Sequence, residues 1–100
     1  MPEKHIPLIM DIIDNIVSPD TRIRKYTDRQ ILKILILLQI FNISCRSSEI
    51  FLSNNQEYLA LTGIHEIPSF QTLSRRARKF DLHALNREIV IWIHSLHTVF

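Results

Sequence analysis

The sequence has 100 residues, of which 46% are hydrophobic and 22% are charged, so it is long enough for one domain with a buried core and too apolar for intrinsic disorder. One glycine and four prolines are too few turn-forming residues for a many-stranded sheet, and we therefore expect an all-α fold, a compact bundle of five to six helices. The net charge of +2 is by itself weak evidence for a polyanionic partner.

The first predicted helix covers residues 7–17 and has Pro7 in its first turn, where the missing N–H costs nothing. Isoleucines recur along it with the spacing of one helical face, at positions 9, 12, 13 and 16. Asp11 and Asp14 interrupt this apolar run, so it does not resemble an export signal. These two carboxylates lack a third ligand, and we interpret them as the solvated side of an amphipathic helix rather than as a metal site.

The second helix is predicted to begin at Asp28, because Thr27 and Gln30 have the spacing of a capping box. Its residues 31–43 are apolar in nearly every direction around the axis, which is typical of a central helix surrounded by others. This stretch is shorter than the ~20 residues that a bilayer requires, and we expect no membrane partner. Residues 22–33 carry a net charge of +4. We expect secondary phosphate contacts from Arg22, Arg24, Lys25 and Arg29.

Two short helices are predicted next, after a polar turn at residues 42–47. The first begins at Ser47 or Ser48 and ends at Asn54-Asn55, and the second covers residues 56–61 and ends before Gly63, in a left-handed cap. The expected core residues are Ile50, Phe51, Leu52, Tyr58, Leu59 and Leu61. Cys45 cannot form an internal disulfide, which favours an intracellular setting, and we interpret it as a packing residue.

The segment 68–80 predicts a helix of three turns with Ser69 as its N-cap. Its apolar side chains fall within an arc of about 80°, which predicts one narrow buried edge. The opposite face carries hydrogen-bond donors and almost no acids, with Arg76 and Arg78 on its flanks, and this composition fits the phosphates and base edges of DNA. The alternative interpretation is an amphipathic surface helix whose charges only keep the protein soluble. As a recognition helix, it is expected to contact DNA through Ser69, Gln71, Thr72, Arg75, Arg76, Arg78 and Lys79.

A last helix is predicted after Asp81, which can cap it. Its apolar residues have near-helical spacing: Leu82, Leu85, Ile89, Trp92, Ile93 and Leu96. The β-branched run at 89–93 also fits a strand, but helix is preferred. An exposed apolar face here predicts a homodimer through the C-terminal helix. His94 and His97 are three positions apart and could share a zinc ion with His83, but the spacing of His83 from them is not that of a zinc site. We therefore expect no metal and no cofactor.

Four short blocks of this sequence occur in an order that is known from a protein family: Tyr26-Thr27-Asp28, then Ile43-Ser44-Cys45-Arg46 with Glu49 following, then Leu61-Thr62-Gly63-Ile64, then Pro68-Ser69-Phe70-Gln71-Thr72-Leu73-Ser74-Arg75-Arg76. Over about residues 26–80 the sequence thereby resembles the N-terminal helical domain of DDE-type insertion-sequence transposases. The resemblance implies a helix-turn-helix-like unit that binds the terminal inverted repeats of the element. It implies that residues 69–79 form the DNA helix, supported by the helices between residues 47 and 61.

Members of that family continue into a ribonuclease-H-like domain whose acidic triad binds two divalent metals, and this sequence lacks the triad. We therefore expect residues 1–100 to be a single helical DNA-binding domain that is not an enzyme, with residues 81–100 leading toward an absent catalytic domain. The expected partner is double-stranded DNA carrying terminal inverted repeats, and the expected location is the prokaryotic cytoplasm, at the nucleoid. The alternative function is a helical oligomerisation or protein-interaction module in which the basic segments are incidental.

Overall fold

The computed structural model describes residues 5–17, 19 and 25–98, with the side chains of 92 and 94–98 excepted. These residues contain no strand, and the prediction of an all-α bundle is confirmed. The radius of gyration is 13.3 Å, close to the ~13 Å expected for a folded domain of 100 residues. The elements are α1 (Ile6–Ile16), α2 (Asp28–Ile40), the 3₁₀ helix η2 (Cys45–Ser47), α3 (Ser48–Asn54), α4 (Gln56–Leu61), α5 (Phe70–Ala77) and α6 (Leu82–Thr98).

Both ends of α2 are defined by capping interactions. The Gln30 backbone N–H donates to Thr27 Oγ1 at 3.2 Å and the Thr27 N–H donates to Gln30 Oε1 at 2.9 Å, so the predicted capping box is confirmed. The helix ends at Ile40, earlier than the apolar stretch, because Asn42 adopts a left-handed φ of 55°. The Ile43 N–H then donates to the Leu38 carbonyl at 2.8 Å, which completes a Schellman motif.

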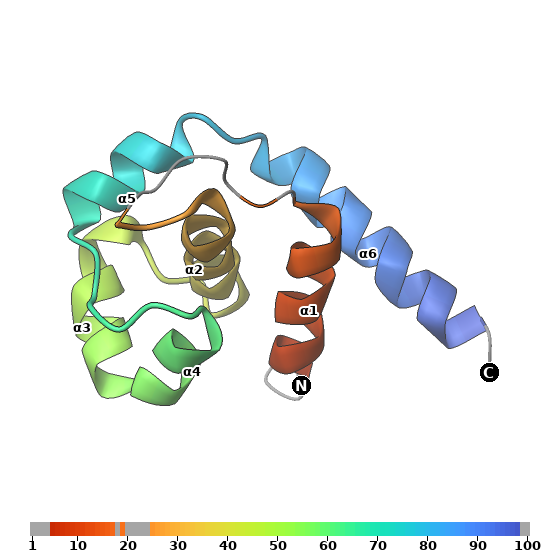
Figure 1. Ribbon diagram of the computed structural model, residues 1–100, viewed down its shortest axis with the longest axis horizontal. Helices are drawn as coiled ribbons and strands as arrows, with labels where there is room; N and C mark the ends of the chain where they lie inside the picture. The colour runs from red at the N-terminus through yellow and green to blue at the C-terminus, as the bar shows by residue number, and fades with distance from the viewer. Residues whose placement is uncertain (1–4, 18, 20–24, 99–100) are drawn as a thin grey trace.

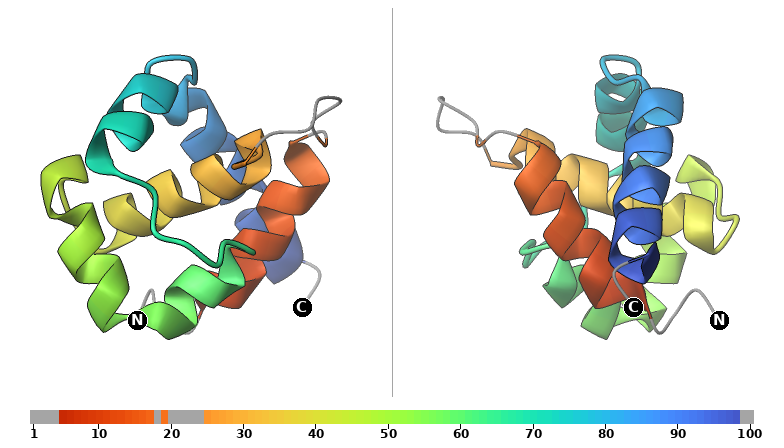
Figure 2. Two further views of the ribbon diagram at one scale, coloured as in Figure 1. Left: turned by 60° about the vertical axis from the view of Figure 1, so that its left-hand side comes forward. Right: turned by 90° about the vertical axis from the view of Figure 1, so that its right-hand side faces the viewer.

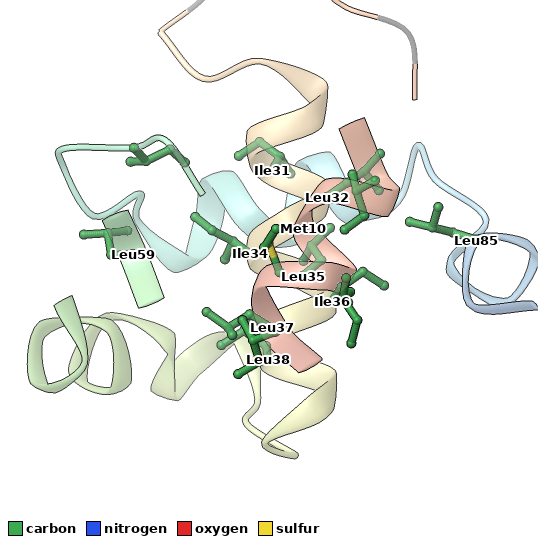
Figure 3. Close-up of a cluster of buried hydrophobic side chains, with 14 of the residues drawn as sticks. Met10, Ile31, Leu32, Ile34, Leu35, Ile36, Leu37, Leu38, Leu59 and Leu85 are labelled. Atoms are coloured by element: carbon green, nitrogen blue, oxygen red, sulfur yellow. The ribbon is translucent and has the colours of Figure 1, made fainter. Parts of the chain in front are cut away.

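The core surrounds α2, as the sequence predicts. All eight residues from Ile31 to Leu38 are buried, and Figures 1 and 2 show α2 passing through the middle of the bundle. Helices α1 and α5 pack directly on α2, and α6 packs on α1. In the close-up of Figure 3, Met10 of α1, Leu59 of α4 and Leu85 of α6 lie on different sides of α2. Each fully buried leucine or isoleucine stabilises this arrangement by about 1.5–3 kcal/mol.

Helices α3 and α4 form where the sequence predicts them, but two of their expected core residues are exposed. The prediction was wrong for Ile50, which is 69% exposed, and for Leu61, which is 39% exposed, whereas Leu52 and Leu59 are buried. The physical reason is the helical rotation of ~100° per residue, which puts side chains two positions apart on opposite sides of a short helix. Aromatic side chains join these helices to the end of α2, with the Phe41 ring centroid 5.2 Å from those of Phe51 and Tyr58.

The C-terminal segment is a helix, not a strand, and Figure 1 shows α6 leaving the bundle beside α1. The predicted cap is confirmed, because the Ala84 N–H donates to Asp81 Oδ1 at 3.0 Å. Leu85 and Ile89 are buried, whereas Val90 and Ile91 are exposed. The predicted inward positions of the Trp92 and Leu96 side chains lie outside the described residues.

Within the described residues, no single helix is long and apolar enough to cross a membrane. Only α2 taken together with Cys45–Asn54, two segments bent by 104°, reaches that length and composition.

Candidate nucleic-acid interface

Helix α5 is held by its N-cap and by buried side chains, of which Leu73 is the apolar one. The Thr72 N–H donates to Ser69 Oγ at 3.2 Å, and the Ser69 and Thr72 hydroxyls lie 3.0 Å apart. The predicted N-cap is therefore confirmed, and both hydroxyls are engaged within the cap. Leu73 is fully buried and anchors α5 on α2. The helix ends at Ala77, one turn earlier than predicted, and residues 78–80 form a turn.

The outward face formed by α5 and the turn after it is cationic. Gln71, Arg75, Arg78 and Lys79 are exposed, and none of the three cations among them makes an ion pair with an acid in the described part of the chain. Gln71 and Arg75 stand four positions apart, so their side chains project from neighbouring points of one face. Free guanidinium and amide groups of this kind are available to a partner with acceptor groups.

Arg76 differs from the expectation, because it turns inward instead of lying on the flank of this face. It is only 8% exposed, its Nη1 donates to the Tyr26 carbonyl at 3.0 Å, and its Nη2 lies 2.5 Å from Asp28 Oδ1. Arg76 is three positions after Leu73, so it lies beside the buried edge and its long side chain reaches the start of α2. It therefore ties α5 to α2.

The second basic segment is also partly used inside the fold. Arg29, expected to contact phosphate, donates from Nε to the Val17 carbonyl at 2.6 Å and from Nη2 to the Asp14 carbonyl at 2.7 Å. These are free carbonyls at the C-terminal end of α1, so Arg29 caps that helix. Lys33 Nζ lies 2.8 Å from Asp14 Oδ1 with a side chain that is 11% exposed. Arg29 and Lys33 thus join α1 to α2.

Lys25 is the exposed member of this segment in the described residues. Its Nζ lies 3.0 Å from Glu66 Oε2. The hydrogen bond that Lys25 donates to Glu66, together with the charge of Glu66, raises the pKa of Lys25 above its ordinary value. A solvent-exposed pair of this kind contributes little to stability. Arg22 and Arg24 lie outside the described residues.

A concavity of about 500 Å³ lies between η2 and α5. Arg46 of η2 contributes to it, although Arg46 is not among the DNA contacts expected from the sequence. Its place in the block of residues 43–46 that carries the family resemblance was the available signal, but only the packing of η2 on α5 brings this side chain next to α5. The lining residues are Arg46, Phe70, Gln71, Ser74, Arg75 and Arg78.

Among the side chains that the structure describes, the candidate metal ligands do not converge. The described residues contain no group of three or more His, Cys, Asp and Glu side chains that is able to hold a metal ion. Asp14, considered with Asp11 as a carboxylate pair, is the partner of Lys33. Cys45 is half-buried, and the side chains of His94 and His97 lie outside the described residues.

These features define a small helical bundle that displays one cationic helix on its surface. Over residues 3–79 the sequence matches the family described as "Transposase domain (DUF772)", and the chain belongs to this family of transposase domains. The transposase-related part of the resemblance is thereby confirmed. No curated protein and no solved structure matches the chain significantly.

Proposed function

We propose that this chain binds double-stranded DNA as the N-terminal helical domain of a DDE-type insertion-sequence transposase, and that it recognises the terminal inverted repeats of the element. The observation that supports this proposal is the outward face of α5, where exposed donors have no acidic partner among the described residues. Membership of a transposase-domain family makes DNA the polyanion that this face would meet.

The dimensions of α5 suit the major groove. An α-helix with its side chains is about 10–12 Å across, and the major groove of B-DNA is about 12 Å wide. In this arrangement Arg75 forks to a guanine edge and Gln71 pairs with an adenine edge, which are the favoured pairings of these side chains. Arg78 and Lys79, in the turn after α5, bind phosphates.

Three residues of the predicted DNA set take other roles in this proposal. Ser69 and Thr72 hold each other at the start of α5, so they position the helix. Arg76 fixes α5 to α2 through Tyr26 and Asp28. The direct contacts are then Gln71, Arg75, Arg78 and Lys79, with Lys25 as a secondary phosphate contact.

The test is a fluorescence-anisotropy titration of a duplex carrying the terminal repeat of the encoding element and of a shuffled duplex. Arg75→Gln should weaken binding to the repeat by about 1–3 kcal/mol and leave binding to shuffled DNA much less affected. Gln56→Ala is the control, because Gln56 is exposed on α4 and belongs to neither of the surfaces proposed here. Equal affinity of the wild type for both duplexes would refute sequence recognition.

A second function, self-association through α6, is favoured by a separate observation. Val90 and Ile91 are 50% and 63% exposed, and they line a concavity of about 680 Å³ with His83, Asn86 and Arg87. We propose that two copies of α6 pair through this face, since water-exposed apolar patches mark interaction surfaces. Ile91→Glu should shift a dimer to monomer in sedimentation, whereas Ile50→Glu, at an equally exposed isoleucine on α3, should not. A monomeric wild type would refute this proposal.

A further inference from the structure

Three guanidinium groups from two separate parts of the chain line one concavity. Arg46 comes from η2, Arg75 from α5 and Arg78 from the turn after α5. The lining includes no acid, and none of these arginines makes an ion pair with an acid in the part of the chain that the structure describes. Like charges on one concave surface repel each other and concentrate positive potential there, and a bound anion relieves that repulsion.

Arg46 is held at this place by a hydrogen-bonded backbone. Ser44 caps η2, with the Ser47 N–H donating to its hydroxyl at 3.4 Å. Ser48 is fully buried and its hydroxyl donates to the Cys45 carbonyl at 2.6 Å. The backbone around Arg46 is thus fixed against α5 while its side chain stays exposed. An arginine fixed at its base loses less conformational entropy on binding than one on a mobile loop.

The remaining lining residues suit one nucleotide of a DNA strand. Gln71 and Ser74 add neutral hydrogen-bond donors, and half-buried Phe70 adds an apolar wall. Guanidinium groups match phosphate oxygens in a bidentate geometry, and an apolar wall fits the deoxyribose next to the phosphate. The side of the concavity formed by Arg46, Arg78 and Phe70 is therefore suited to the sugar-phosphate backbone, beside the base edges assigned to Gln71 and Arg75.

We propose that the concavity between η2 and α5 binds a backbone phosphate of DNA, and that Arg46 is the residue that extends the contact from α5 to the strand beside it. This inference rests on the proposed function, because α5 must lie on DNA for the strand to reach Arg46. A phosphate contact fixes the register of a protein on the duplex without reading sequence. Substitution of Arg46 should therefore weaken binding to any duplex, whereas substitution of Arg75 should weaken binding mainly to the terminal repeat.

The first experiment compares the salt dependence of DNA binding by the wild type, Arg46→Gln and the control Gln56→Ala. Arg46→Gln should weaken binding to the terminal-repeat and shuffled duplexes by the same factor. It should also reduce the slope of log K against log salt by about 0.9, the value for one phosphate contact on B-DNA. Gln56→Ala, on α4 and outside both proposed surfaces, should leave both quantities unchanged. An unchanged slope for Arg46→Gln, or a loss confined to the terminal repeat, would overturn the proposal.

The second experiment leaves the protein intact and replaces single phosphates of the terminal-repeat duplex with neutral methylphosphonates. One replacement should weaken the wild type and have no further effect on Arg46→Gln, because the charge pair is then already lost. If every replacement affects the two proteins equally, Arg46 does not bind phosphate. Wild-type protein that fails to bind any duplex would overturn the proposed function and this inference together, whereas normal binding by Arg46→Gln would overturn the inference alone.

Discussion

Arg76 provides the sharpest test of how this fold holds its cationic helix. The side chain is 8% exposed, and its guanidinium reaches both the Tyr26 carbonyl and the Asp28 carboxylate. Its Nε is buried without a hydrogen-bond partner. Arg76→Met keeps an unbranched side chain that can fill the space along α5, and it removes both contacts to the start of α2. We expect this change to destabilise the protein.

The size of the effect follows from these contacts. Two hydrogen bonds to a charged group contribute about 1.5–3 kcal/mol each. The substitution also removes the buried Nε that has no hydrogen-bond partner, and this removal raises the free energy of unfolding by about 1–3 kcal/mol. Asp28 lies in the first turn of α2, where a carboxylate is favourable, and its side chain is 34% exposed, so it stays partly solvated without Arg76. The expected net loss is about 2 kcal/mol.

Urea unfolding followed by circular dichroism measures this loss. A change of about 2 kcal/mol should lower the urea midpoint by about 1–2 M at an unchanged slope, and should lower Tm by roughly 8–16 °C. Arg75→Met is the matched control, because Arg75 is the exposed neighbour on the same helix, and it should change stability by less than about 0.5 kcal/mol. Equal stability of the two variants would refute the role assigned to Arg76.

Three further predictions concern the elements that position the site, and each is checked by the same urea titration. Thr27→Ala removes the acceptor for the Gln30 N–H and should cost about 1 kcal/mol, whereas Thr27→Ser should be nearly neutral, so equal losses would contradict the capping box. Gly63→Ala should cost about 1–2 kcal/mol because φ at Gly63 is +82°, and a stabilised variant would contradict that backbone conformation. Leu73→Ala opens a cavity beneath α5 at a fully buried position and should cost about 2.7–5 kcal/mol, and a loss below 1 kcal/mol would show that Leu73 is not in the core.

The architecture was predictable because its signals are local. The capping box at Thr27, the cap at Asp81, the left-handed Gly63 and the apolar residues of α2 each follow from short sequence patterns, and the structure confirms them. The end of α2 was not predictable from hydrophobicity, because the Schellman motif at Asn42 stops the helix inside an apolar run. Hydrophobicity also failed to predict which side chains of the short helices α3 and α4 are buried, because only one side of each helix packs on the core.

The candidate site was harder to predict because its arginines have different long-range partners. Arg75, Arg76 and Arg29 look alike in the sequence, yet Arg75 is exposed, Arg76 pairs with Asp28 across 48 positions, and Arg29 binds α1 carbonyls. Tertiary packing decides which of them is free. The same packing brings Arg46 to α5, and no local pattern indicates that approach.

The most direct test of the proposed function is an NMR titration of the amide-labelled protein with the terminal-repeat duplex. We predict that the largest chemical-shift changes occur at residues 70–79 and at Arg46, and that amides on the outer face of α6 around Arg87 stay unchanged. The shuffled duplex should produce smaller changes at the same places. Changes centred on α6, with α5 unaffected, would contradict the claim that α5 is the DNA-binding helix.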